Sequence, residues 1–313
     1  MAVWGGMAIR YRFPGPESVR MLIGATFALL GLVALFARLW TGRNSTLAPF
    51  LLAFALLAGW WNSLKPPAVG DWSPDVARQV TGQIDGDILT LTNVRNFEWH
   101  DDGSFTANWN RQAYDLNDLA TVDLFLSYWA GPSMAHFILS FGFEGGQYLA
   151  WSIEVRREVD GSFSPVADLF KANPIVIVAA NERDVVGLRT NIRRENVQLF
   201  RLKPDKKTAR NLLEEYVRDA NALAEAPEWY NSITTNCTTV VLKMMQAIGD
   251  GLPLDWRIIV NGYLPEFGYD RGALNTEYSI AELRRLGSVS SKGQSFSLKP
   301  GYSEAIRDGV PRP

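Results

Sequence analysis

Residues 122–158, VDLFLSYWAGPSMAHFILSFGFEGGQYLAWSIEVRRE, carry the clearest structural pattern in the chain. The stretch contains three runs of β-forming residues, 122–129, 135–143 and 147–158, with glycine in the segments between them. Runs of this length and composition, joined by short turns, predict consecutive antiparallel strands. The centre of the protein is therefore expected to be a strand-rich sheet.

The residues on either side of this stretch extend the pattern. Alternating polar and apolar residues begin at about residue 82, in DGDILTLTNVRNFEW, and predict another strand. The sequence predicts further strands at 174–179 and 197–202 and helices over about 182–192, 205–225 and 237–248, the last ended by Gly249. Strands with a few helices packed on them indicate the α+β class.

Two apolar segments lie near the N-terminus. Residues 21–37 and 47–64 contain no charged side chain, and each is near the length that a membrane-spanning helix needs. The polar residues between them include Arg38 and Arg43. We expect a two-helix transmembrane hairpin, and the alternative is a pair of buried core helices.

These patterns divide the chain into five parts. We expect an N-terminal tail over residues 1–20, two transmembrane helices over 21–64, a proline-rich linker over 65–81, a domain of soluble character over 82–285 and a loosely ordered tail over 286–313.

Composition excludes several classes of function. The net charge is −2, so no electrostatic footprint for nucleic acid is present. One cysteine and two histidines nearly exclude a zinc site of the usual ligands. Neither a dinucleotide-binding glycine motif nor a P-loop occurs. We therefore expect no metal, no cofactor and no nucleic-acid partner.

The single cysteine lies in YNSITTNCTTVVL, residues 230–242, at the start of the helix predicted over 237–248. Thr235 and Asn236 can supply the N-cap oxygen. Cys237 would then lie in the first turn, where the helix dipole is expected to lower the pKa of the thiol. Cys237 is thus a candidate nucleophile, and the alternative is a buried side chain without chemistry.

The candidate base is His136, which lies within the strand predicted over 135–143. Glu154 lies on the next strand and can orient the imidazole as the third member of a triad. Two alternatives remain open at this point. His136 can be a hydrogen-bonded core residue, and Glu154 can form an ordinary salt bridge with Arg156 or Arg157.

Several collinear stretches are similar to one bacterial family. They are NVRNFEW (93–99), VDLFLSYW (122–129), MAHFILSFGF (134–143), SIEVRRE (152–158), NERDVVGLRTNIR (181–193), NCTT (236–239) and LPLDWRIIVNGYLPE (252–266). The region from about 85 to 272 resembles the N-terminal periplasmic domain of the lipoprotein intramolecular transacylase Lnb and its relatives.

This resemblance implies a permuted papain-like thiol fold, an antiparallel sheet with packed helices in which the histidine strand precedes the cysteine helix. It implies Cys237 as nucleophile, His136 as general base and acid, and Glu154 as the orienting residue. Asn236 and the amides near Thr238 are expected to stabilise an oxyanion. Two arginines at 183 and 189 are expected either to form ion pairs or to contact an anionic head group.

The resemblance also implies a location and a function. Family precedent places the catalytic domain in the periplasm, tethered to the bacterial inner membrane, although three arginines before the first span against two after it slightly favour the opposite orientation. We expect a cysteine acyltransferase or esterase that acts on membrane lipid or lipoprotein through a thioester. The alternatives are a cysteine peptidase or amidase of the cell envelope, and a non-catalytic membrane-anchored binding domain.

Overall fold

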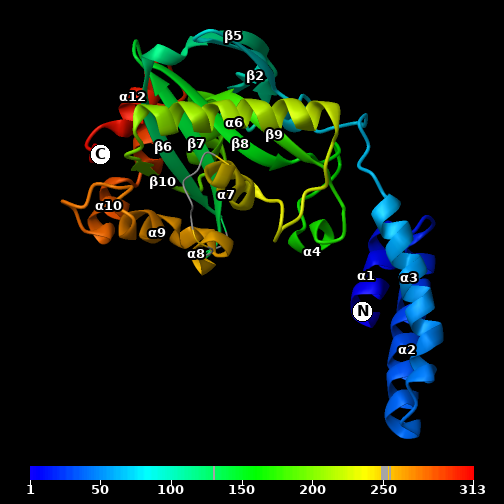
Figure 1. The fold of residues 1–313 in the computed structure, drawn as a ribbon. Helices are drawn as coiled ribbons and strands as arrows, with labels where there is room; N and C mark the ends of the chain where they lie inside the picture. The colour runs from blue at the N-terminus through cyan, green and yellow to red at the C-terminus, as the bar shows by residue number, and fades with distance from the viewer. Residues whose placement is uncertain (130, 248–252, 254) are drawn as a thin grey trace. The chain divides into compact units, whose positions relative to one another are not determined.

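The computed structural model describes residues 1–129, 131–247, 253 and 255–313 (Figure 1). The chain forms two compact units. The smaller comprises Met1–Gly70, Ser162–Pro174 and Pro227–Ser232, and the larger comprises Asp71–Gly161, Ile175–Ala226 and Ile233–Pro313.

The larger unit is built on an eight-stranded sheet. Its main path runs β1-β2-β9-β8-β7-β6-β10, and β5 pairs with β2 off this path. The strands are β1 (Thr81–Asp85), β2 (Ile88–Arg95), β5 (Trp109–Asp115), β6 (Leu119–Tyr128), β7 (Ala135–Phe143), β8 (Gln147–Val155), β9 (Ile175–Asn181) and β10 (Asn196–Arg201), and a separate pair joins β3 (Glu98–Trp99) to β4 (Phe105–Thr106).

The three strands predicted from residues 122–158 are confirmed as β6, β7 and β8. They pair in sequence order and antiparallel, with Ser127 opposite His136 and Ile138 opposite Ser152. All strand pairs described are antiparallel except β2 and β9, which meet in parallel at Arg95 and Ala180. With helices packed on this mixed sheet, the α+β class is confirmed.

Both faces of the sheet are buried, which explains why these strands are so continuously apolar. Helix α6 (Lys206–Glu225) crosses one face (Figure 1), where Tyr216 packs against Phe141 and Trp151. Its start is capped by the side chain of Asp205, which accepts from the Thr208 amide. The helix predicted over 205–225 is thus confirmed.

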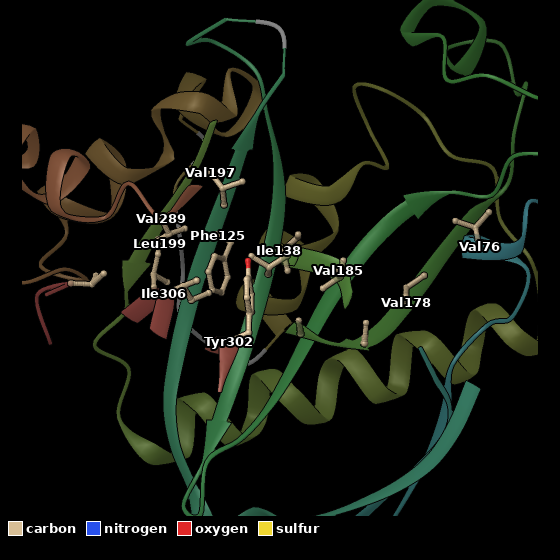
Figure 2. Close-up of a cluster of buried hydrophobic side chains, with 14 of the residues drawn as sticks. Val76, Phe125, Ile138, Val178, Val185, Val197, Leu199, Val289, Tyr302 and Ile306 are labelled. Atoms are coloured by element: carbon tan, nitrogen blue, oxygen red, sulfur yellow. The ribbon is translucent and has the colours of Figure 1, made fainter. Parts of the chain in front are cut away.

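The opposite face carries Phe125 and Ile138, which pack with residues of the C-terminal segments (Figure 2). Helices α11 (Ser290–Phe296) and α12 (Tyr302–Arg307) supply part of this layer, and Tyr302 and Ile306 are fully buried in it. The loosely ordered tail expected over 286–313 is therefore a wrong prediction. Serine, glycine and lysine dominate its composition, but its few large side chains, such as Tyr302 and Ile306, complete the core.

The remaining helices of the larger unit are short. They are η2 (Pro74–Val76), η3 (Leu116–Asp118), α5 (Glu182–Gly187), η4 (Leu188–Ile192), α7 (Cys237–Ala247), α8 (Trp256–Ile259), η5 (Asn261–Tyr263), α9 (Leu264–Asp270) and α10 (Ile280–Leu286). The helix predicted over 182–192 is α5 followed by η4. The predicted end of the cysteine helix, at 248 and 249, lies outside the described residues. From Asp71 onward, the expected linker belongs to this unit.

The smaller unit contains α1 (Ala2–Arg12), α2 (Glu17–Thr41), η1 (Asn44–Leu47), α3 (Ala48–Ser63) and α4 (Pro165–Asp168). Two of its helical segments, Glu17–Thr41 and Asn44–Ser63, are long and apolar enough to cross a membrane. Most of the tail expected over residues 1–20 is instead helix α1. A side chain at Gly6 on α1 would come within 2.7 Å of the Gly24 carbonyl on α2, so α1 and α2 approach each other closely through backbone atoms.

Candidate active site

The site is built where the ladder between β7 and β8 ends. Their pairing stops at Ile138 and Ser152, although β7 begins at Ala135 and β8 continues to Val155. The neighbouring pairs, β6 with β7 and β8 with β9, continue to those ends. Backbone groups of β7 that face β8 are therefore released at this point, next to His136.

His136 is held by the neighbouring strand. Its Nε2 atom lies 2.7 Å from the Ser152 hydroxyl and 3.0 Å from the Glu154 carboxylate, and the Ser152 hydroxyl also donates to Glu154. A proton on Nε2 satisfies these acceptors and leaves Nδ1 as the unprotonated ring nitrogen. The hydrogen bonds thus select the tautomer in which Nδ1 is the base.

The charges around the ring set its protonation state. Burial lowers the pKa of His136, and the nearby Arg189 guanidinium adds to this effect, so that together they outweigh the attraction of Glu154. Although burial alone would raise it, His136 and Arg189 hold the pKa of Glu154 well below its ordinary value. At neutral pH the site therefore holds a neutral imidazole beside an ionised carboxylate.

Cys237 begins helix α7, as predicted. The Asn236 side-chain oxygen accepts from the amides of Thr238, at 2.9 Å, and Thr239, at 3.0 Å, which is an N-cap. The thiol is only 8% exposed, and burial raises its pKa, against the opposing effects of the Phe137 backbone and the Thr238 hydroxyl. The expected lowering of the thiol pKa is therefore wrong, because desolvation outweighs the donors at the helix start.

The Phe137 backbone, one residue beyond His136, is close enough to the sulfur to affect its pKa, so the sulfur lies near the released part of β7. None of the hydrogen bonds among the described residues joins the sulfur to the imidazole, whose Nε2 is engaged by Ser152 and Glu154. The structure therefore brings Cys237, His136 and Glu154 to one end of β7 and β8, with the thiol and the imidazole in separate hydrogen-bond groups.

Asn261, on η5, joins the histidine strand to the cysteine helix and is not among the residues expected at the site. Its side chain exchanges two hydrogen bonds with the Ala135 backbone, at 2.9 and 2.7 Å, and donates to the Thr238 hydroxyl at 2.9 Å. The same Nδ2 atom lies 3.9 Å from the Cys237 sulfur. A buried amide that bridges the histidine strand and the cysteine helix fixes their separation. The only sequence signal was the polar Asn-Gly pair that follows the apolar residues 258–260.

The comparisons with known proteins bear on the same region. The family described as "Lnb N-terminal periplasmic domain" matches residues 105–262, which is just over half of the chain. The chain belongs to the Lnb N-terminal periplasmic domain family. Neither the curated proteins nor the solved structures include a match. His136, Glu154, Cys237 and Asn261 all lie inside the segment shared with the Lnb family.

The two arginines predicted as ion-pair or head-group residues lie in different places. Arg189 is buried and faces the carboxylates of Glu154, at 3.4 Å, and Glu195, at 3.2 Å. This arrangement fits the ion-pair alternative. Arg183 is half-buried and lines a separate cavity of the Lnb-type domain. Thr238 is buried, and its hydroxyl contacts Asn261 and lies 3.9 Å from the sulfur.

Proposed function

We propose that this Lnb-family chain is a membrane-tethered thiol acyltransferase or esterase. The observation that carries the proposal is the gathering of Cys237, His136 and Glu154 at one end of β7 and β8. There Glu154 orients the imidazole, and Asn261 joins the cysteine helix to the Ala135 backbone, next to His136. An activated thiol needs a base within reach and a third group that orients that base. Cys237, His136 and Glu154 supply these three roles.

The protonation states favour general-base catalysis over a preformed ion pair, because both the thiol and the imidazole are neutral at rest. Nδ1 of His136 takes the proton as the sulfur attacks the ester carbonyl, and a carbon–sulfur bond forms. The tetrahedral intermediate collapses, the carbon–oxygen bond breaks, and the imidazolium protonates the leaving alcohol. An amine or water then attacks the thioester, gives a proton to His136 and releases the thiol.

Exposed apolar side chains near the site favour a substrate with acyl chains. Trp129 and Met134 flank the loop before β7, and Trp256 and Ile259 lie on α8; all four are exposed. Gly262 allows η5 to approach this loop, since a side chain there would lie 2.0 Å from the Pro132 carbonyl. Large apolar groups rimming a polar site are typical of surfaces that bind lipid.

The two helical segments that can span a membrane support action at a bilayer, because tethering raises the effective concentration of a lipid substrate. We place the domain on the periplasmic side of the inner membrane, following the precedent of the family. The acceptor is an amine if the enzyme transfers the acyl group and water if it hydrolyses the ester.

The test is intact-protein mass spectrometry of the full chain in detergent after incubation with a diacylated lipopeptide or a phospholipid. We expect an acyl adduct on Cys237 that is absent from Cys237→Ala. His136→Gln should slow adduct formation by about 10²–10⁴-fold, the usual contribution of a general base.

Thr239→Ser, which keeps the hydroxyl beside the helix start, serves as the control and should form the adduct at the parent rate. Acylation that persists in Cys237→Ala would overturn the assignment. Cleavage of an envelope peptide that depends on Cys237, without any lipid adduct, would instead support the peptidase.

A further inference from the structure

The larger unit contains a second polar region that shares no residue with the thiol site. It is a cavity of about 530 Å³, a size within the usual range for small-molecule sites. Its walls come from β5, the β7–β8 turn, the junction of β9 with α5, and the residues before and within α12. The polar side chains lining it include Gln112, Gln147, Asn181, Arg183, Lys299 and Glu304.

The back of this cavity is rigid. The ring of Tyr148 lies over the Arg307 guanidinium, 3.9 Å from the ring centroid, and Arg307 is itself fixed by Glu182 and Asp123. Tyr302 is buried, and its hydroxyl lies 2.7 Å from that of Thr190. Side chains held in this way form a wall that exists before any ligand arrives.

The charges in the cavity are not neutralised by the protein. Among the residues that the structure describes, neither Arg183 nor Lys299 has an ion pair or a side-chain hydrogen bond. Glu304 supplies one negative charge and lies at the Gly145–Gly146 turn, 3.1 Å from the position of a side chain at Gly146. Two cations and one carboxylate leave the cavity with one uncompensated positive charge.

We propose that this cavity binds a hydroxyl-bearing molecule with one anionic group, a carboxylate or a phosphodiester. The Arg183 guanidinium presents paired donors that match such a group, and Lys299 adds a second positive charge. The amides of Gln112, Gln147 and Asn181 and the carboxylate of Glu304 suit hydroxyl groups, which both donate and accept. The inference is independent of the thiol chemistry proposed above.

The test uses calorimetric titration of the full chain in detergent with D-glucuronate, and with glucose as its neutral counterpart. We expect saturable binding of glucuronate that weakens with added salt, and at least tenfold weaker binding of glucose. Arg183→Gln should weaken glucuronate binding about tenfold, and Lys299→Gln by a smaller factor, since charge-assisted hydrogen bonds are stronger than neutral ones.

Arg111→Gln is the matched control. Arg111 precedes Gln112 on β5, is exposed and does not line the cavity, so its variant should bind within about twofold of the parent. Competition by phosphatidylglycerol vesicles, but not by phosphatidylcholine vesicles, would identify the anion as a lipid head group, and no competition would identify a soluble molecule. Equal binding of glucose, equal loss in Arg111→Gln, or no saturable binding up to about 10 mM would overturn the proposal.

Discussion

Two polar clusters share one face of the sheet and are built from the same kinds of residue. On β6 and β7 the paired positions are Ser127 with His136, Phe125 with Ile138, and Asp123 with Ser140. The apolar middle pair therefore separates two polar layers. Each layer gathers serine, carboxylate and arginine side chains from elements that are distant in the sequence.

The layers differ in how closely their charges are matched. At one end, Arg307 binds both Glu182 and Asp123, Arg201 adds a second ion pair to Asp123, and Ser140 donates to Glu182. At the other end, Arg189 is shared between Glu154 and Glu195 at 3.4 and 3.2 Å, Arg193 comes only within 3.9 Å of Glu195, and a titratable imidazole faces Glu154. Chemistry is thus expected where the network contains a group that can change its charge.

The largest effect should come from breaking the fully matched cluster. Arg307→Ala leaves the fully buried Glu182 without its counter-charge and leaves the fully buried Asp123 with Arg201 alone. Removing one partner of a buried ion pair typically costs about 3–5 kcal/mol. We expect a loss of this size in the free energy of unfolding, measured by urea denaturation of the full chain in detergent.

The control for that experiment is Arg111→Ala, which removes an exposed arginine of β5. A surface substitution away from ion pairs and from the core usually changes the free energy of unfolding by no more than about 0.5 kcal/mol, so this variant should be close to the parent. If both variants lost the same small amount, the cluster around Arg307 would not be the structural one.

The sequence predicted much of the sheet and the main residues of the candidate site. A strand with a period of two can be recognised from its own residues, without knowledge of the fold. Polar residues such as His136 and Glu154 are also conspicuous within apolar runs. Asp123 and Ser127 on β6 follow the same period, and their role is not evident from the sequence. Their partners are 68 or more residues away, so no local pattern identifies them.

The features that the sequence did not predict have a common physical origin: each depends on tertiary contacts that local composition does not reveal. Arg307 lies in a segment whose small and polar residues are typical of a loose tail. Its guanidinium nevertheless binds Asp123, which lies 184 residues earlier in the chain. Asn261 looks like a turn residue until the fold brings it to Ala135. The raised pKa of Cys237 likewise depends on burial, which the helix-start pattern alone does not reveal.

A middle-sized effect is expected from Asn261→Ala. The substitution leaves the amide and carbonyl of Ala135 without their side-chain partners in a buried place. Unsatisfied buried groups cost about 1–3 kcal/mol, so the free energy of unfolding should fall by this amount. Asn275→Ala, which removes exposed hydrogen bonds to the Arg312 carbonyl and from the Glu277 amide, should have little effect. Equal losses in the two variants would show that Asn261 does not hold the cysteine helix against β7.

The smallest effect concerns pH and separates the two clusters most directly. In the folded protein the pKa of His136 lies below its ordinary value of 6.5. Below about pH 6.5 the unfolded chain therefore binds a proton that the folded chain does not, and folding stability falls as the pH falls. One such group contributes a slope of at most about 1.4 kcal/mol per pH unit, and no slope above about pH 7.

His136→Gln should remove this contribution, so urea denaturation between about pH 5 and 7 should show a shallower slope for the variant than for the parent. The lowered pKa of Glu154 also makes the folded state less stable as the pH falls, but at lower pH than His136 does. The stabilisation from Glu154 is complete above its pKa in the unfolded chain, about 4.5, and is lost as the pH falls toward its pKa in the folded protein. Arg201→Gln, in the matched cluster, serves as the comparison, since it removes no group that titrates in this range. A parent slope that survived in His136→Gln would place the titrating group elsewhere and remove the distinction between the two clusters.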